Sequence, residues 1–235
     1  MTETTRLGLP LVQAAQAQKH VTVNSGLERL DALVKLVLTS LDETVPPEQP
    51  DGMYAVPPGA LGAWEGKGGM VAFAANGGWD FASPQQGWSA WIADLGAAAI
   101  HDGSEWIPGA VTLSWSGAGI SLRTVETDHV VTPGPASSTS AVIPAQSVVY
   151  GVTGRVLSQI GGDATAFDLG IAGEAPDRYG TGYSLNAGSW LRGLTSSPLA
   201  YYAPTALTLT AVGGSFTGGS VRLAVHLAEL RVPGS

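Results

Sequence analysis

The chain has 235 residues, of which 44% are hydrophobic and only 13% are charged, against roughly 25% charged in an average soluble domain. The net charge of −8 excludes the basic surface that nucleic-acid binding needs and disfavours anionic membrane surfaces. The chain has no cysteine, which excludes disulfides, cysteine-ligated zinc and thiol catalysis. No apolar run is long enough for a membrane span or a signal peptide, so we expect a protein made in the cytoplasm.

Residues 1–48 are predicted to form an N-terminal anchoring or oligomerisation segment with one helix. Ser25 and Glu28 have the spacing of a capping box, which predicts that the helix starts there. Pro46 and Pro47 are expected to end it. A heptad-like apolar stripe follows the cap, at Leu27, Leu30, Val34, Val37 and Leu41. Two interpretations stay open: an amphipathic helix packed on its own domain, or a short self-association helix.

Residues 49–110 are predicted to form a small, tryptophan-rich antiparallel β unit, because Asn-Gly and Asp-Gly dipeptides mark hairpin turns. Five of the seven tryptophans lie here: Trp64, Trp79, Trp88, Trp91 and Trp106. A unit of this size has little core, so most of these rings should be buried. Trp88 and Trp91 should point to opposite faces of one strand, and Trp88 is a candidate for stacking on a sugar.

The remaining chain is predicted to be β-rich. Residues 111–140 should contain strands and a Pro/Ser/Thr-rich linker. Residues 141–235 should form a C-terminal β-sandwich or jelly roll that serves as a possible receptor-binding domain. The clearest strand covers residues 221–228, where valine and leucine occupy every second position. The expected fold class is therefore mainly β with a short N-terminal helix.

Catalytic and metal-binding motifs are missing from the sequence. It has no nucleophile elbow, no zinc-protease motif and no phosphate-binding loop. The four histidines are scattered, and carboxylates such as Asp163, Glu174 and Asp177 have no metal-site spacing, although folding could gather them around calcium. We therefore expect a protein that is not an enzyme and has no cofactor or resident metal.

The best candidate for binding is the segment 174–193. It carries Tyr179, Tyr183, Trp190 and Arg192 among glycines and serines, a composition that suits recognition by rigid aromatic groups. The alternative is that Tyr183 and Trp190 close one end of the sandwich.

Several sequence blocks resemble a family of unknown biochemical function that is found in alphaproteobacterial prophages and gene transfer agents. The N-terminal half resembles it at residues 10–24, 30–33, 51–54, 62–64, 87–88 and 102–106. The last half resembles the C-terminal domain that often accompanies that family, at residues 143–144, 151–156, 167–174, 202–203 and 213–226. The resemblance implies a tail-fibre or head-spike subunit of a phage-like particle that is released by lysis. It also favours self-association, with a trimer as the expected state, and supplies no catalytic residues.

Three functions follow from this sequence. The first is a fibre or spike that contacts other capsid or tail proteins and binds surface or capsular polysaccharide of the host. The second is a structural adaptor, such as a spike base or fibre connector, without affinity for glycans. The third is a glycan-cleaving enzyme, which would need a carboxylate pair in a groove and has no motif in the sequence.

Overall fold

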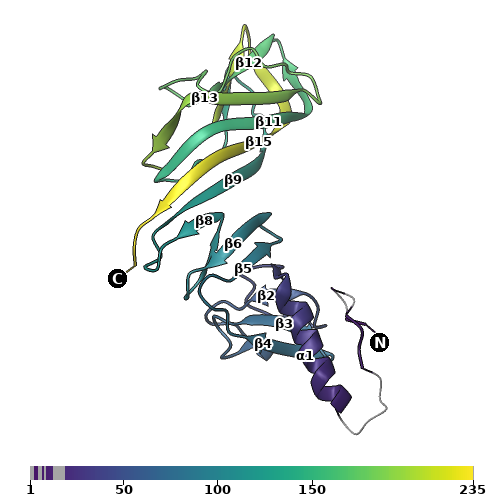
Figure 1. Ribbon diagram of the computed structural model, residues 1–235. Coiled ribbons are helices and arrows are strands. Elements are labelled where there is room, and N and C mark those ends of the chain that lie inside the picture. The colour runs from purple at the N-terminus through teal and green to yellow at the C-terminus, as the bar shows by residue number, and fades with distance from the viewer. Residues whose placement is uncertain (1–2, 5–6, 8, 13–18, 235) are drawn as a thin grey trace. The chain divides into compact units, whose positions relative to one another are not determined.

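The computed structural model describes residues 3–4, 7, 9–12 and 19–234 and confirms the mainly β fold (Figure 1). The chain divides into two compact units, Met1–Trp115 and Ser116–Ser235, which we call the N-terminal and C-terminal units. The boundary falls inside the stretch 111–140, where strands and a linker were expected. No helix in the described part of the chain is long and apolar enough to cross a membrane.

The helix α1 spans Lys19–Val34, so the predicted start and end were both wrong. Ser25 lies inside the helix rather than at its cap. Val37 and Leu41 lie beyond its end, and Val37 pairs with Trp91 in the short parallel strand β1 (Val37–Leu38). Leaving the helix buries the side chain of Leu38 completely. Burying a leucine contributes about 1.5–3 kcal/mol, more than the few tenths by which helix propensities differ.

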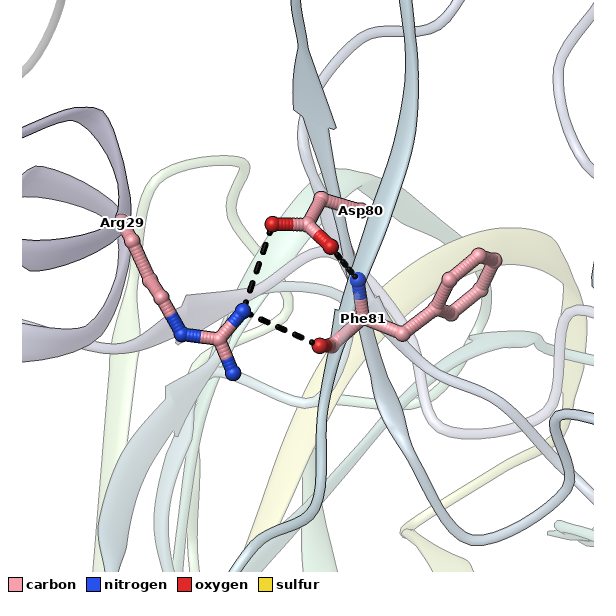
Figure 2. Close-up of polar contacts among 3 residues, drawn as sticks. All are labelled: Arg29, Asp80 and Phe81. Atoms are coloured by element: carbon pink, nitrogen blue, oxygen red, sulfur yellow. Dashed lines mark hydrogen bonds and ion pairs between the residues drawn. The ribbon is translucent and has the colours of Figure 1, made fainter. Parts of the chain in front are cut away.

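Polar contacts and burial hold α1 on its own unit. Ala32 is buried in the core that also contains Met53 and Phe73. Arg29 donates through Nη1 to Asp80 Oδ2 at 3.2 Å and to the Phe81 carbonyl at 3.3 Å. Figure 2 shows both contacts. The side of α1 that carries Arg29 and Ala32 therefore packs on its own unit, as the amphipathic-helix interpretation predicts.

The N-terminal residues that the structure describes also contact α1. Asp31 is only 5% exposed and accepts hydrogen bonds from the Thr4 hydroxyl and the backbone N–H of Leu7. Asn24 donates to the carbonyl of Val12 and accepts from its N–H. These two hydrogen bonds to Oδ1 explain how a buried carboxylate is tolerated on α1, because a buried polar group needs hydrogen-bond partners.

Two small sheets and a 3₁₀ turn complete the N-terminal unit. One sheet has the order β1-β5-β6-β7 and the other β2-β3-β4. The elements are β2 (Met53–Ala55), η1 (Gly62–Trp64), β3 (Val71–Ala75), β4 (Gly78–Ala82), β5 (Ser89–Ile92), β6 (Ala97–His101) and β7 (Trp106–Pro108). The short strand β8 (Ala110–Leu113) follows and belongs to neither of these two sheets. Val71 and Phe73 face the core shared with α1, whereas Ala72 faces a second cluster around Trp64.

The tryptophans of this unit are mostly structural, as predicted. Trp64 and Trp106 are buried, and Trp79 and Trp88 are partly buried against the core. Trp91 is 47% exposed. The centroid of the Trp64 ring lies 5.1 Å from the ring centroids of both Tyr54 and Trp79. The Tyr54 ring is tilted against Trp64 and the Trp79 ring meets it edge-on, and aromatic pairs prefer such geometries.

The C-terminal unit is an antiparallel β-sandwich, as predicted. Long strands form one sheet in the order β13-β11-β15-β9, and shorter strands form the other in the order β10-β14-β12. The elements are β9 (Gly119–Val130), β10 (Ala136–Ser138), β11 (Ser147–Gly162), β12 (Ala166–Gly170), β13 (Trp190–Tyr201), β14 (Thr208–Val212) and β15 (Phe216–Arg231). The four long strands lie side by side in Figure 1. Val221, Leu223, Val225 and Leu227 of β15 are all buried between the sheets, which confirms their predicted alternation.

The core around Trp64 generates a stability prediction. The indole Nε1 is buried with no hydrogen-bond partner among the described residues, so the ring contributes through packing alone. We expect Trp64→Ala to destabilise the protein by about 3–5 kcal/mol, as for other large-to-small core changes. Trp64→Phe should cost clearly less, because it removes the unpaired N–H and keeps an aromatic ring. Urea denaturation of both variants checks the order, and equal losses would contradict it.

Candidate functional site

The outward face of the long sheet carries the candidate site. Side chains alternate along each strand, so residues two apart share a face. The strand register aligns Trp190, Arg155, Arg222 and Asp128 in one row across four strands. The next row contains Arg192, Thr153, Ala224 and Glu126. We call these two rows the Trp190 surface.

Trp190 is the dominant feature of this surface, since 70% of it is exposed. The guanidinium carbon of Arg192 lies 5.4 Å from the centroid of its ring, which is a cation–π contact. The two residues belong to the same strand and the same face. The contact restrains the indole while most of the ring stays open to solvent.

Arg222 is held by two carboxylates. Its Nε and Nη2 donate to the two oxygens of Asp128 at 2.6 and 2.8 Å, a bidentate geometry. Glu126 lies 3.6 Å from the same Nε. The hydrogen bond from Arg222 keeps the pKa of Asp128 below its usual range. Both carboxylates are therefore engaged in charge pairing within the surface.

Arg155 and Arg192 differ from Arg222, because neither forms an ion pair with a described residue. Arg155 lies directly across from Trp190 on one side and from Arg222 on the other. The pairing of β11 with β15 shifts register between Val156 and Ser158. Arg155 is therefore the last outward-facing residue of β11 before this irregularity. Bulges of this kind often lie beside binding sites, where they redirect side chains.

A depression of about 330 Å³ lies within the Trp190 surface. It is lined by Trp190, Leu191, Arg192, Arg155, Arg222, Glu126, Thr153, Gly154 and Ala224. This volume is at the lower end for ligand pockets, which span about 300–1,000 Å³. The arrangement offers one flat aromatic face and several guanidinium donors to a small polar group.

The other predicted binding residues do not join this surface. Tyr179 is completely buried, which corrects its assignment as a contact residue. Its hydroxyl lies 2.7 Å from that of Tyr201, and burial raises the pKa of Tyr179. The Tyr183 hydroxyl donates to the Tyr179 carbonyl, and its ring packs on Phe167, so Tyr183 helps to close the sandwich. Trp88 packs against the core of the N-terminal unit.

Sequence reasoning brought Trp190 and Arg192 together but missed Arg155, Arg222 and Glu126. The alternation along 147–162 and 216–231 could have placed the two arginines on outward faces. It could not have placed them in one row, because a row depends on the register between strands that are distant in the sequence.

The acidic residues considered for calcium are used in turns. Asp163 Oδ1 accepts from the Ser215 N–H at 2.7 Å, and Glu174 lies 3.9 Å from Arg178. The described residues contain no group of three or more histidine, aspartate or glutamate side chains that could hold a metal. The structure therefore does not gather Asp163, Glu174 and Asp177 into one cluster of carboxylates.

The histidines have structural positions. His101 is 3% exposed, and its Nδ1 accepts a hydrogen bond from the Gly103 N–H at 3.2 Å. Burial lowers the pKa of His101 and that of His129. His226 lies on the outward face, where its ring nitrogens contact the hydroxyls of Thr153 and Thr124 at 2.8 and 3.3 Å.

A second exposed feature lies on α1. Val23, Leu27, Leu30 and Val34 are spaced by four, three and four residues, so they form one stripe on the helix. Val23, Leu30 and Val34 are 46%, 49% and 57% exposed. Ala32, which faces the core, is two residues from Leu30 and from Val34 and therefore lies roughly on the opposite side. We call these four residues the α1 stripe.

The N-terminal unit is similar to a known protein family. A family described as "Protein of unknown function (DUF2793)" matches residues 23–107, a segment that lies within the N-terminal unit and runs from α1 to β7. This match supports the resemblance of the N-terminal half to a family without a known biochemical role. No curated protein matches the chain.

Among solved structures, the chain is similar to a chain of the "Cyanophage Pam1 capsid asymmetric unit", with 21% sequence identity and a TM-score of 0.33. The likeness covers 48% of this chain and 86% of the cyanophage chain.

Gly193 generates a prediction about how the site is supported. It lies in β13 between Arg192 and Leu194, and a Cβ added there would collide with the backbone of Tyr179. We expect Gly193→Ala to lower the melting temperature, because two backbone segments must separate. Gly26→Ala is the matched control: it lies inside α1 with open space around it, and should stabilise by roughly 0.5–1 kcal/mol. An unchanged melting temperature for Gly193→Ala, measured by calorimetry, would contradict the close packing.

Proposed function

We propose that the protein is a non-enzymatic structural subunit of a phage-like particle, a tail fibre or head spike, whose C-terminal unit binds polysaccharide on the host surface. The observation that carries the binding role is the Trp190 surface, where an exposed indole stands beside two arginines without ion pairs. The particle role rests on the family resemblance of the sequence.

The shape and chemistry of the Trp190 surface favour a saccharide. A flat aromatic ring can stack on the C–H face of a sugar while guanidinium groups donate to its oxygens. The surface is shallow and lies on a sheet, so a long polymer can cross it without threading into a cleft. Several copies in one particle would convert weak single contacts into firm attachment through avidity.

The carboxylates of the surface favour binding over cleavage. A glycosidase needs one carboxyl group with a raised pKa as general acid and a second as base or nucleophile. Asp128 has a lowered pKa, because it accepts a bidentate hydrogen bond from Arg222. Glu126 lies near the same guanidinium. The hydrogen bond from Arg222 stabilises the charged form of Asp128, which is the opposite of what a general acid requires.

A second candidate is a structural adaptor without glycan affinity, in which the same surface contacts another capsid or tail protein. The exposed leucines favour it, because Leu194 on the strand of Trp190 is 74% exposed and Leu157 on the neighbouring β11 is 42% exposed. Apolar side chains gathered on one face are typical of protein contacts. The adaptor predicts contact with protein and none with polysaccharide.

The α1 stripe supports self-association, with a trimer as the proposed state. Its apolar side chains face away from the unit's own core and have the spacing of a coiled-coil seam. Two heptads are short for an independent coiled coil, so the assembly would need further contacts between copies. The predicted stripe was Leu27, Leu30, Val34, Val37 and Leu41. Val37 and Leu41 lie beyond the end of α1 and Val23 lies within it, so the stripe is corrected to Val23, Leu27, Leu30 and Val34.

Attachment to cells tests the binding role. We expect the labelled protein to bind capsulated bacteria and to bind an isogenic capsule-free strain much more weakly. Trp190→Ala should lower binding at least tenfold, because a stacking aromatic group at the centre of an interface contributes about 2 kcal/mol or more. Trp115→Ala is the control, since Trp115 is 91% exposed in the N-terminal unit. Equal binding to both strains would favour the adaptor.

Oligomer mass tests the role of α1. The double change Leu30→Glu with Val34→Glu should shift the protein toward monomer, because charged side chains in an apolar seam repel and lose hydration. Val21→Glu is the matched control on the same helix, since Val21 is 55% exposed and lies off the stripe. Sedimentation equilibrium gives the masses, and an unchanged mass for the double variant would exclude the α1 stripe as the contact.

A further inference from the structure

We propose that the Trp190 surface selects polysaccharides whose sugar units carry carboxylate groups. This inference rests on the proposed function and names its ligand class. The geometry places Arg155 across the ladder from the exposed indole of Trp190 and Arg192 against its ring. The ring would take the face of a sugar, and the arginines would take its carboxylate.

Arg155 and Arg192 lack the ion-pair partners that other described arginines have. Four other arginines each form an ion pair with an aspartate or a glutamate. The pairs are Arg29–Asp80, Arg123–Glu229, Arg178–Glu174 and Arg222–Asp128. Arg155 and Arg192 form none. They remain available to an external anion.

Arg155 lies directly opposite Arg222 in the neighbouring strand, a position in which like charges are destabilising. Asp128 and Glu126 balance the charge of Arg222 and limit this repulsion, and neither carboxylate forms an ion pair with Arg155. An anion bound beside Arg155 would gain a charge-assisted hydrogen bond.

Charge is distributed unevenly along the chain. Residues 1–115 contain five lysines and arginines against twelve aspartates and glutamates, whereas residues 116–235 contain six against seven. The C-terminal unit is therefore nearly neutral in a protein with a net charge of −8. The Trp190 surface holds three of its six cations and two of its seven carboxylates, so the surface carries a net charge of +1. A surface of this charge can accept an acidic polymer that the N-terminal unit would repel.

Carboxylate is the anion that best fits the site. Guanidinium binds carboxylate in a planar, two-pronged geometry, and a carboxyl group on a sugar ring lies at the edge of the face that stacks on an aromatic ring. A depression of about 330 Å³ suits a small group of this kind. The hydroxyl of Thr153, which contacts Nε2 of His226 at 2.8 Å, also borders the depression.

Calorimetric titration with defined polymers tests the selection. The probes are polygalacturonate, hyaluronan and alginate, each compared with its carboxyl-reduced form. We expect binding to at least one acidic polymer and at least tenfold weaker binding to its reduced form. Arg155→Gln and Arg192→Gln should each weaken the acidic interaction about tenfold, since removing a charged hydrogen bond costs about 1.4 kcal/mol or more. Arg123→Gln is the control, because it removes the same charge from the opposite face of the same sheet.

Three outcomes would overturn the selection: no binding to any acidic polymer, equal binding to the reduced polymers, or unchanged binding by both arginine variants. Equal binding to dextran sulfate and duplex DNA would also overturn it, because it would show attraction to any polyanion. Capsule-dependent cell binding that is lost in Trp190→Ala but kept in both arginine variants would leave the glycan role standing and remove only the acidic class.

Discussion

The antiparallel pairing of β11 with β15 is the constraint on which the C-terminal unit depends. These two strands form the centre of the long sheet, and their alternation directs valines and leucines such as Val152 and Val225 into the core. The same alternation directs Arg155 and Arg222 outward. A shift by one residue would reverse every side chain, exposing the apolar set at a cost of about 1.5–3 kcal/mol for each. The register that builds the core therefore also fixes the outward row.

The Trp190 surface has features that burial energy alone does not explain. A large exposed indole and two arginines facing each other across a ladder contribute little to folding and cost some stability. Departures from the rules of stability are expected at functional sites, and this expectation agrees with the binding role that we propose for this surface. The carboxylates of Asp128 and Glu126 limit the repulsion between the two arginines. Arg222 is therefore held in the sheet surface by ion pairs, whereas Arg155 and Arg192 form no ion pair with a described residue.

The N-terminal unit solves a different problem, because it must build a core from short strands. It does so with large aromatic rings and with one side of α1, which Arg29 fixes to β4 (Figure 2). The other side of α1 keeps its apolar stripe exposed. One helix thus completes the core of its own unit and leaves an apolar stripe exposed, which is the basis of the self-association that we propose. The two interpretations of this helix from sequence are compatible, because they concern opposite sides of it.

The sequence by itself determined the fold class, the sandwich, the strand over 221–228 and the structural use of most tryptophans, since these depend on local periodicity and on composition. It also identified Trp190 and Arg192, which are neighbours on one strand. Only the tertiary structure ended α1 at Val34, because the burial of Leu38 in a sheet outweighs helix propensity. Only it buried Tyr179 and aligned Arg155 with Trp190, because burial and register depend on contacts between segments that are distant along the chain.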